Sequence, residues 1–270
     1  MSGLDRPLPV ALEAVSEIVH TAKGRRFAVF LDYDGTLTPI VDRPELAVMS
    51  QAMRTTVQTL SRHCLVAIVS GRDRVDIERL VNLESLYFAG SHGFEINGPR
   101  ASQIHHEIGA RYLPALDRAE ADLRGELRLT SGALVERKKY SVAVHFRLVR
   151  DADLKKVDAA VAGVISGRPE LRKRDGKKVY EIQPNIEWDK GKAVLWLLEA
   201  LHLTKDNSFP LYIGDDLTDE DAFQALKDNG IGVVVGRTAR PTAAQYTLNN
   251  PDDVARFLEQ MAAHLETKSS

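Results

Sequence analysis

Short runs of apolar residues recur along the chain, and each ends in a turn of polar residues or glycine. The runs cover residues 27–31, 65–69, 86–89, 211–213 and 231–235. A short run without polar interruption is typical of a strand buried on both faces, as in a parallel sheet. Residues 10–19, 50–62 and 190–201 instead place apolar residues at helical spacing. This alternation of buried strands and helices predicts an α/β fold with a doubly wound parallel sheet.

The middle of the chain has a different pattern, in which the predicted strands mix polar and apolar residues. Strands of this kind have one face against a core and the other in solvent. Asp175-Gly176 is a typical hairpin signal near the end of this region. The pattern predicts helices over 111–127 and 152–165, and strands within 134–149 and 171–183.

We therefore expect a small α+β unit, residues 107–183, inserted into a core made of residues 1–106 and 184–270. The insertion contains 17 Lys and Arg and 12 Asp and Glu, a net charge of +5, whereas the rest of the chain carries −7. A basic insertion on an acidic core suits an anionic substrate that binds through a divalent cation. The basic residues within 172–178 would equally suit a solvent-exposed hairpin.

The composition is that of an ordinary folded protein, with 44% apolar and 27% charged residues over 270 positions. The net charge of −2 gives no reason to expect a nucleic acid or an anionic membrane as partner. Cys64 is the single cysteine, which excludes an intrachain disulfide and indicates a reducing compartment. The N-terminus makes a poor signal peptide, and no apolar run approaches the roughly 18 residues that span a bilayer. These features predict a cytoplasmic protein.

Polar residues follow several predicted strands at the edge where open α/β sheets bind their ligands. Asp32 and Asp34 follow the first strand, Ser70 the second, and Asp215 and Asp216 a later one. Carboxylates that converge on one point repel each other and resist ionisation. A hard divalent cation relieves this repulsion, and Mg²⁺ fits because it takes oxygen ligands and shares them with phosphate. The pattern therefore predicts a Mg²⁺ site.

The segment DYDGT (32–36) carries the sharpest chemical signal. Two aspartates two positions apart at a strand end can divide labour, one attacking the substrate and the other transferring protons. Gly35 keeps the turn open enough for backbone N–H groups to approach phosphate oxygens. The alternative is an Asx turn without chemistry.

Two further segments allow both a structural and a functional interpretation. Ser70-Gly71-Arg72 can form a turn and cap a helix, or Ser70 can bind a phosphate oxygen there. Lys190 begins a helix, where a cation opposes the helix dipole. Its unfavourable position hints that a phosphate, rather than the helix, requires its charge.

Four motifs together resemble those of the haloacid-dehalogenase (HAD) superfamily of phosphohydrolases, and they occur in that family's order. They are DYDGT (32–36), SGR (70–72), DKG (189–191) and GDDLTDED (214–221). The resemblance implies a Rossmann-like core with a C2-type cap, because the insertion lies between the second and third motifs. The second aspartate of the first motif is that of the phosphatases, whereas the P-type ATPases have threonine there.

Longer strings resemble the trehalose-6-phosphate phosphatase family. They are AGSHGFEI (89–96), VERKKYSVAVHFR (135–147), GKKVYEIQPN (176–185) and YIGDDLTDEDAF (212–223). This resemblance implies a Mg²⁺-dependent hydrolase of trehalose biosynthesis that acts on trehalose 6-phosphate. It also implies that the cap binds the disaccharide through Glu136, Lys138 and Glu181. Exposed polar positions on a β-sheet are the alternative for these three residues.

The resemblance further assigns the core residues. It implies Asp32 as the nucleophile that forms an aspartyl-phosphate and Asp34 as the general acid and base. Metal ligands would be Asp32, the backbone carbonyl of Asp34 and Asp215, with Asp216 or Asp219 in support. Ser70 and Lys190 would neutralise phosphoryl oxygens, and Ser70, Gly71 and Arg72 would contact the substrate.

Two other functions stay open at this point. A related sugar phosphatase for sucrose-phosphate or mannosylglycerate phosphate would share every core motif. A catalytically silent regulatory module should have lost a motif carboxylate, whereas Asp32, Asp34 and Asp215 are all present. The sequence does not say whether a trehalose-6-phosphate synthase binds as a partner.

Overall fold

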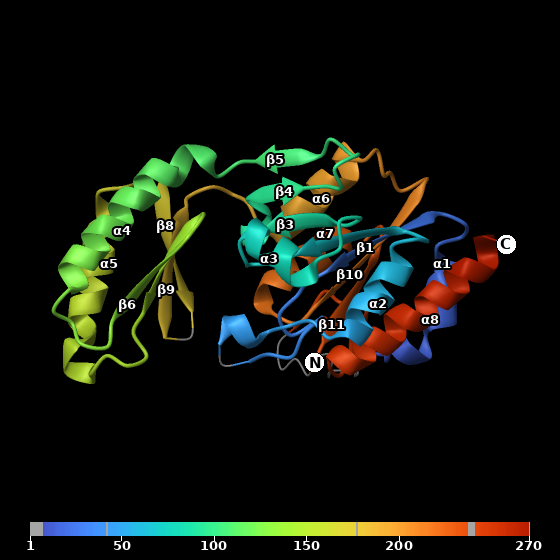
Figure 1. Cartoon of the computed structure of the whole chain (residues 1–270), viewed down its shortest axis with the longest axis horizontal. Coiled ribbons are helices and arrows are strands. Elements are labelled where there is room, and N and C mark those ends of the chain that lie inside the picture. Colours follow the sequence, from blue (N-terminus) through green and yellow to red (C-terminus); the bar gives the residue numbers. More distant parts are fainter. Residues whose placement is uncertain (1–7, 42, 177, 237–240, 270) are drawn as a thin grey trace, which may run out of the picture. The chain divides into compact units, whose positions relative to one another are not determined.

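The computed structural model describes residues 8–41, 43–176, 178–236 and 241–269. The chain folds into two compact units (Figure 1). The first comprises Met1–His106 and Trp188–Ser270, and the second comprises Glu107–Glu187. The α/β class expected from the sequence is confirmed, because the structure contains a mostly parallel sheet and a separate antiparallel one.

An eight-stranded sheet forms the centre of the first unit. In spatial order its strands are β12 (Tyr246–Leu248), β11 (Ile231–Val235), β10 (Ser208–Gly214), β1 (Arg26–Leu31), β2 (Leu65–Val69), β3 (Tyr87–Gly90), β4 (Glu95–Asn97) and β5 (His105–Glu107). The strands from β12 to β3 run parallel, and β4 runs antiparallel to β3. Phe27 and Val29 of β1 pack into one hydrophobic cluster, whereas Ala28 and Phe30 pack into another. Burial on both faces explains the uninterrupted apolar run of this strand.

Helices cover both faces of this sheet (Figure 1). One face carries α1 (Val15–Thr21), α2 (Gln51–Leu60), α3 (Arg74–Val81) and α8 (Pro251–Ser269), and the other carries α6 (Lys190–Ala200) and α7 (Glu220–Leu226). The predicted doubly wound arrangement is therefore confirmed. The strand order reverses between β1 and β10, because β2 and β3 follow on one side and β10 to β12 on the other. Such a reversal opens a crevice at the carboxyl ends of the strands, where ligands bind.

The helix predicted over 10–19 is wrong in its first half. Ala11–Glu13 form a short 3-10 helix, and α1 begins only at Val15. Val10 instead forms a parallel bridge with Thr247, whose N–H donates to the carbonyl of Pro9 at 3.0 Å. The start of this segment is extended because it pairs with β12.

The second unit is a four-stranded antiparallel sheet covered on one face by two helices (Figure 1). The strands, in spatial order, are β6 (Leu134–Lys138), β7 (Ser141–His145), β9 (Val179–Pro184) and β8 (Leu171–Gly176), and the helices are α4 (Leu113–Leu127) and α5 (Leu154–Ser166). Leu116 and Leu123 of α4 and Val161 of α5 pack with Val142 and Ile182 of the sheet. The opposite face is polar, as the mixed sequence pattern predicts.

The predicted hairpin is present, but its turn lies further along the chain. Asp175 pairs with Tyr180 and Gly176 with Val179, so both predicted turn residues belong to β8. The connection runs through residue 177, which lies outside the described residues, and Lys178, whose φ is 64°. The connection follows the DG pair because Asp175 and Gly176 extend the pairing by two residues.

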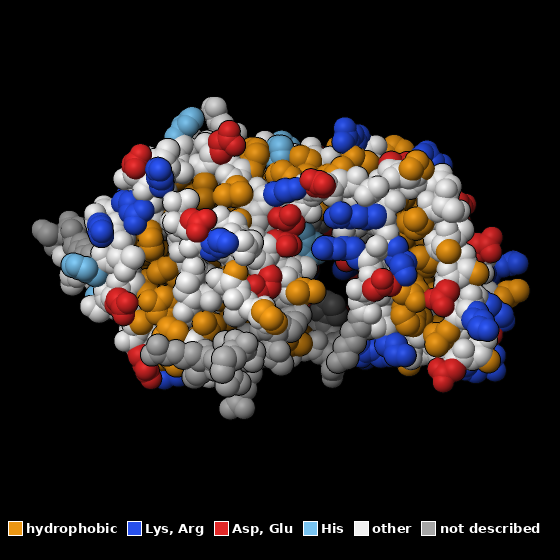
Figure 2. All heavy atoms as spheres, turned by 180° about the vertical axis from the view of Figure 1, so that it is seen from behind, with side chains coloured by type: hydrophobic (Ala, Val, Ile, Leu, Met, Phe, Trp, Pro, Cys, Tyr) orange, Lys and Arg blue, Asp and Glu red, His pale blue; other side chains and the backbone are white. Residues whose placement is uncertain are grey.

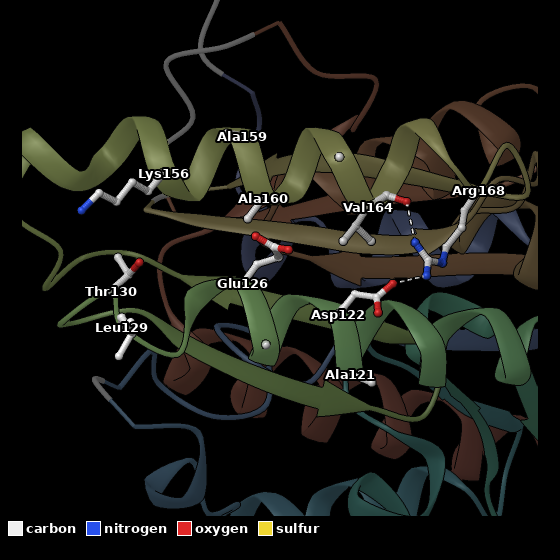
Figure 3. Close-up of a pocket in the computed structure, with 12 residues that line it drawn as sticks. Ala121, Asp122, Glu126, Leu129, Thr130, Lys156, Ala159, Ala160, Val164 and Arg168 are labelled. Carbon is white, nitrogen blue, oxygen red and sulfur yellow. Dashed lines mark hydrogen bonds and ion pairs between the residues drawn. The ribbon is translucent and has the colours of Figure 1, made fainter.

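A groove of about 780 Å³ lies between α4 and α5 (Figure 3). Small residues border it on each helix, among them Ala121 and Gly125 on α4 and Ala159 and Gly163 on α5. Arg168 closes one end by donating to the Val164 carbonyl and pairing with Asp122. These small side chains leave the groove between the two helices open.

Charged side chains of both signs cover the face shown in Figure 2, with hydrophobic side chains between them.

The remaining short 3-10 helices are Pro44–Leu46, Ser91–Gly93, Ala110–Tyr112, Asp151–Asp153 and Leu217–Asp219. Among the described helices, none combines the length and apolar character that crossing a membrane requires.

Leu123→Ala should destabilise the second unit by about 2–5 kcal/mol, because Leu123 is fully buried between α4 and the sheet. Leu129→Ala is the matched control, because Leu129 is 84% exposed and its loss should change stability by less than about 0.5 kcal/mol. Urea denaturation followed by circular dichroism measures both changes. Equal losses would contradict the packing of α4 described here.

Candidate active site

The first and fourth motifs meet because β1 and β10 are neighbours in the sheet. Leu31 pairs with Ile213 in the parallel register, and the N–H of Asp32 donates to the Ile213 carbonyl at 2.9 Å. Asp32 follows the end of β1, and Asp215 follows the end of β10. Residues far apart in sequence thus lie at the strand-order reversal, as expected for a ligand site.

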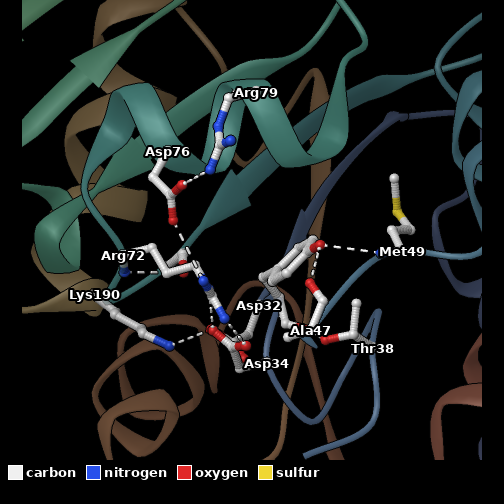
Figure 4. A network of polar contacts seen from close by, with 11 residues as sticks. Asp32, Asp34, Thr38, Ala47, Met49, Arg72, Asp76, Arg79 and Lys190 are labelled. Carbon is white, nitrogen blue, oxygen red and sulfur yellow. Dashed lines mark hydrogen bonds and ion pairs between the residues drawn. The ribbon is translucent and has the colours of Figure 1, made fainter. Parts of the chain in front are cut away.

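Lys190 joins these two strand ends through its side chain. It is 3% exposed, and its Nζ donates to Asp32 Oδ1 at 2.6 Å (Figure 4). The same Nζ donates to Asp219 Oδ1 at 2.7 Å. Burial would lower the pKa of Lys190, but the charges of Asp219 and Asp32 raise it above its ordinary value. Two carboxylates therefore compensate the lysine charge that the helix dipole disfavours.

Asp219 is fully buried and makes contacts in three directions. Its Oδ1 accepts from Lys190 and from the hydroxyl of Tyr212 at 2.7 Å, and its Oδ2 accepts from the Asp216 N–H at 2.9 Å. The contact with Asp216 belongs to a capping box at the start of the 3-10 helix Leu217–Asp219. Asp219 thus stabilises a helix start and also forms part of the charged cluster.

Sequence reasoning missed Tyr212. Its side chain is fully buried in β10, and in the sequence it is one more residue of an apolar strand. Burial and the nearby Asp219 raise the pKa of its hydroxyl well above the ordinary value, so it stays a donor. Its position two residues before the motif GDDLTDED (214–221) gives no separate signal.

Three carboxylates, those of Asp32, Asp215 and Asp219, form a group that could hold a metal ion. One oxygen from each lies within 4.8 Å of the others. Burial raises the pKa of Asp215 to about 7, and the charges of Asp219 and Asp216 add to this effect. Burial also raises the pKa of Asp32 well above its ordinary value, although Lys190 partly offsets the change.

The charge and the chemistry of this group fit a divalent cation. When ionised, three carboxylates and the Lys190 ammonium leave two negative charges in a largely buried cluster. Oxygen-only donors suit a hard cation such as Mg²⁺, and its charge would balance the cluster. The carboxylate of Asp34 is not part of this group and is paired elsewhere.

Gly35 lets the first motif approach Asp215. Its φ is +85°, and an added Cβ would lie 2.1 Å from Asp215 Oδ2. Its N–H donates to the Thr38 carbonyl at 2.8 Å, which closes the turn after β1. Only glycine satisfies both the left-handed backbone and this close approach.

The SGR segment lies in the turn between β2 and α3. Ser70 is 2% exposed, and its Oγ accepts from the Arg72 N–H at 3.2 Å. The ring of His92 packs against Gly71, where an added Cβ would lie 2.9 Å from His92 Cε1. The N–H of His92 also donates to the Ser70 carbonyl at 2.8 Å. His92 therefore supports this turn, and a larger residue at Gly71 would displace the His92 ring.

Asp34 points toward this turn and pairs with Arg72 (Figure 4). Two hydrogen bonds of 2.7 Å join the guanidinium to both oxygens of the carboxylate. Tyr33, between the two aspartates, is buried and its hydroxyl contacts the Ala47 carbonyl at 2.8 Å and the Met49 N–H at 3.2 Å. Tyr33 thereby anchors the strand end while Asp32 and Asp34 face polar partners.

In the second unit, Glu136, Lys138 and Glu181 share the polar face of the sheet. Glu136 and Glu181 both pair with Ala143 across neighbouring strands, which places them in one row. Lys138 Nζ lies 3.7 Å from Glu181 Oε1, and the Ser141 hydroxyl donates to the same oxygen at 2.9 Å. Glu136 contacts His145 Nε2 at 2.8 Å. Strand alternation and register bring the three residues together, although 45 positions separate Glu136 from Glu181.

Comparison with known proteins identifies relatives of this chain. The trehalose-phosphatase family model matches residues 30–252. A trehalose 6-phosphate phosphatase of Zea mays is 41% identical over 269 residues, which cover 94% of this chain and 74% of that protein. The C-terminal domain of Candida albicans trehalose-6-phosphate phosphatase gives a TM-score of 0.77 at 23% identity, covering 96% of this chain and 99% of that one.

A regulatory protein also has this fold. The C-terminal domain of the Candida albicans trehalose synthase regulatory protein gives a TM-score of 0.72 at 13% identity, covering 94% of this chain and 100% of that one. Both structural likenesses show the fold alone. The family match and the 41% identity to the Zea mays protein identify the relationship. The chain belongs to the trehalose-phosphatase family.

Proposed function

We propose that this protein is a phosphatase that hydrolyses trehalose 6-phosphate to trehalose and inorganic phosphate. The observation that carries the proposal is the cluster of Asp32, Asp215 and Asp219 around Lys190 at the strand-order reversal, in a chain of the trehalose-phosphatase family. The 41% identity to the Zea mays phosphatase supports the choice of substrate.

In the first step, Asp32 attacks the phosphorus atom in line with the sugar oxygen. A bond forms between an Asp32 oxygen and phosphorus, and the bond from phosphorus to the sugar 6-oxygen breaks. Asp34 gives its proton to that oxygen, which leaves as the hydroxyl of trehalose. Asp32 is suited to attack because its carboxylate is buried and held at one oxygen by Lys190.

In the second step, water attacks the phosphorus atom of the aspartyl-phosphate. Asp34, now ionised, takes a proton from the water, and the bond between phosphorus and the Asp32 oxygen breaks. Inorganic phosphate leaves, and both carboxylates return to their starting states. Ser70 and Lys190 are the proposed donors to phosphoryl oxygens, so that positioning and charge stabilisation provide most of the catalysis.

Mg²⁺ is the proposed cation, with Asp32, Asp215 and the backbone carbonyl of Asp34 as ligands and Asp219 in support. When bound, the cation supplies charge stabilisation for phosphoryl oxygens. Its charge would also offset the repulsion that helps to raise the pKa of Asp215 to about 7. Oxygen-only donors in the carboxylate group support a hard cation of this kind.

The sugar part of the substrate is assigned to Glu136, Lys138 and Glu181 of the second unit. Their shared polar face offers carboxylate acceptors and an ammonium donor, which suit sugar hydroxyls. Among the core residues, the Ser70-Gly71 turn is assigned to the phosphate end. Substrate specificity would then reside in residues 107–183, and the chemistry in the rest of the chain.

The alternatives differ in what they require. A phosphatase for sucrose-phosphate or mannosylglycerate phosphate would use the same core and a different sugar-binding face. A silent regulatory module would not require the buried Lys190 cluster. We favour the enzyme because the carboxylates of Asp32, Asp215 and Asp219 form one group and Lys190 pairs with two of them, Asp32 and Asp219.

The protein should release phosphate from trehalose 6-phosphate with Mg²⁺ and lose this activity in EDTA. Sucrose 6-phosphate, glucose 6-phosphate and mannosylglycerate phosphate, assayed in parallel, should be much poorer substrates. Equal, metal-dependent rates on all four would overturn the substrate assignment and keep the chemistry. No release from any of them would favour the regulatory module.

Asp32→Asn should reduce turnover by at least about 10⁴-fold, as loss of a covalent nucleophile does in other enzymes. The fold should persist, because Lys190 keeps Asp219 as partner and the cluster loses one repelling charge. Asp206→Asn, at an exposed turn, is the control and should retain full activity. Steady-state kinetics and thermal unfolding measure both properties. An active Asp32→Asn protein would remove Asp32 as the nucleophile.

Lys138→Met and Glu181→Gln should lower kcat/KM for trehalose 6-phosphate by about 10-fold or more, as loss of a charged hydrogen bond does. Turnover of 4-nitrophenyl phosphate, which lacks the sugar, should be preserved. Lys173→Met is the matched control: Lys138 and Lys173 are each 37% exposed, but Lys173 lies over the Tyr180 ring on the helix-covered face. Equal losses on both substrates would mean that the two residues are structural.

A further inference from the structure

Arg72 binds the carboxylate of Asp34 in a bidentate pair (Figure 4). Its Nε donates to Asp34 Oδ2 and its Nη2 to Asp34 Oδ1, each at 2.7 Å. A guanidinium fork of this kind fixes the plane of a carboxylate as well as attracting it. The Asp34 side chain is 44% exposed, so this pair limits rotations that solvent would otherwise allow.

Arg72 is held firmly enough to act as a support. Its side chain is 12% exposed, and its guanidinium carbon lies 5.5 Å from the centre of the Tyr33 ring. Its Nη1 donates to Asp76 Oδ2 at 3.3 Å, and its backbone N–H donates to Ser70 Oγ at 3.2 Å. Contacts from the strand end, the turn and the helix therefore fix its position.

The support continues along α3. Asp76 lies in the first turn of this helix, and its Oδ1 accepts from Arg79 Nη2 at 2.7 Å. Residues three apart on a helix are neighbours, so Arg79 holds Asp76 from the side away from Arg72. Asp34, Arg72, Asp76 and Arg79 thus form a row of alternating charges that ends on α3.

We propose that Arg72 is a positioning residue that orients the Asp34 carboxylate for proton transfer. This inference rests on the proposed function, which gives Asp34 its acid and base roles. The family resemblance implies Arg72 as a substrate contact, and in the structure its guanidinium binds Asp34 and Asp76. The hydrogen bond to Asp34 raises the pKa of Arg72 above its ordinary value, so Arg72 stays charged.

Arg72 forms and breaks no covalent bond in this account. The proton moves from Asp34 to the sugar oxygen in the first step and from water to Asp34 in the second. Both oxygens of Asp34 accept from Arg72 when the carboxylate is ionised. When Asp34 carries the proton, the protonated oxygen is released from the pair and the other oxygen still accepts from Arg72, so the direction of the side chain is kept.

Arg72→Gln tests the proposal through the leaving group. With trehalose 6-phosphate, kcat should fall by about 10²-fold, the typical cost of misplacing a catalytic group. The loss with 4-nitrophenyl phosphate should be much smaller, because its leaving group needs little proton donation. KM for trehalose 6-phosphate should change little. A raised KM with equal losses of kcat on both substrates would make Arg72 a substrate contact and overturn the proposal.

Two variants separate positioning from general loss of charge. Arg62→Gln is the control: Arg62 is exposed and lies outside this support, so its loss should leave both activities unchanged. Asp76→Asn weakens the support of Arg72 and should give a smaller loss with the same dependence on the leaving group. An Asp76→Asn protein with full activity on trehalose 6-phosphate would contradict the role of α3 in this support.

The decisive measurement is Arg72→Gln in the Asp34→Asn background, assayed with phenyl phosphate. If Arg72 acts through Asp34, its loss should cost about 10-fold in the parent protein and less than about twofold in that background. Equal losses in both backgrounds would overturn the proposal, with thermal unfolding confirming that each variant is folded. Failure of the parent protein to hydrolyse any phosphate ester would instead reject the proposed function.

Discussion

The site depends on one buried ammonium group placed between two carboxylates. A charged lysine that is 3% exposed would be costly without partners, and breaking such a pair leaves an uncompensated charge in the interior. Lys190 begins α6, Asp32 follows the end of β1, and Asp219 ends the 3-10 helix that follows β10. The requirement that these charges meet holds three segments of the chain in one arrangement, and the remaining features of the site follow from it.

Asp215 is placed by the same arrangement. It follows β10 and approaches the turn after β1 so closely that Gly35 has no room for a side chain. Burial raises the pKa values of Asp32 and Asp215, and the repulsion among three carboxylates that one ammonium cannot balance adds to this effect. The structure thus pairs Lys190 fully and leaves the cluster short of positive charge. A divalent cation would supply the missing positive charge.

Sequence patterns predicted the strands that are buried on both faces. They missed the shortest strands and the exact position of the hairpin turn. Runs such as 27–31 and 231–235 became strands because both faces are buried, but β4 and β5 have three residues each and are too short to show a period. The hairpin turn was placed two residues early because Asp175 and Gly176 continue the ladder. Motif positions identified Asp32, Asp215 and Lys190, whereas Tyr212 and the pairing of Arg72 with Asp34 depend on side-chain directions that spacing alone does not contain.

The two aspartates of the first motif have opposite environments, although one residue separates them. The Asp32 side chain is 6% exposed and held by a buried ammonium, whereas the Asp34 side chain is 44% exposed and held by a guanidinium. A nucleophile must stay fixed and unhydrated before attack, which burial provides. An acid–base group must exchange protons with water between steps, which exposure provides, yet it must also point in one direction. An exposed carboxylate lacks the packing that would fix its orientation. A bidentate partner can fix it instead, and Arg72 is placed to do this for Asp34.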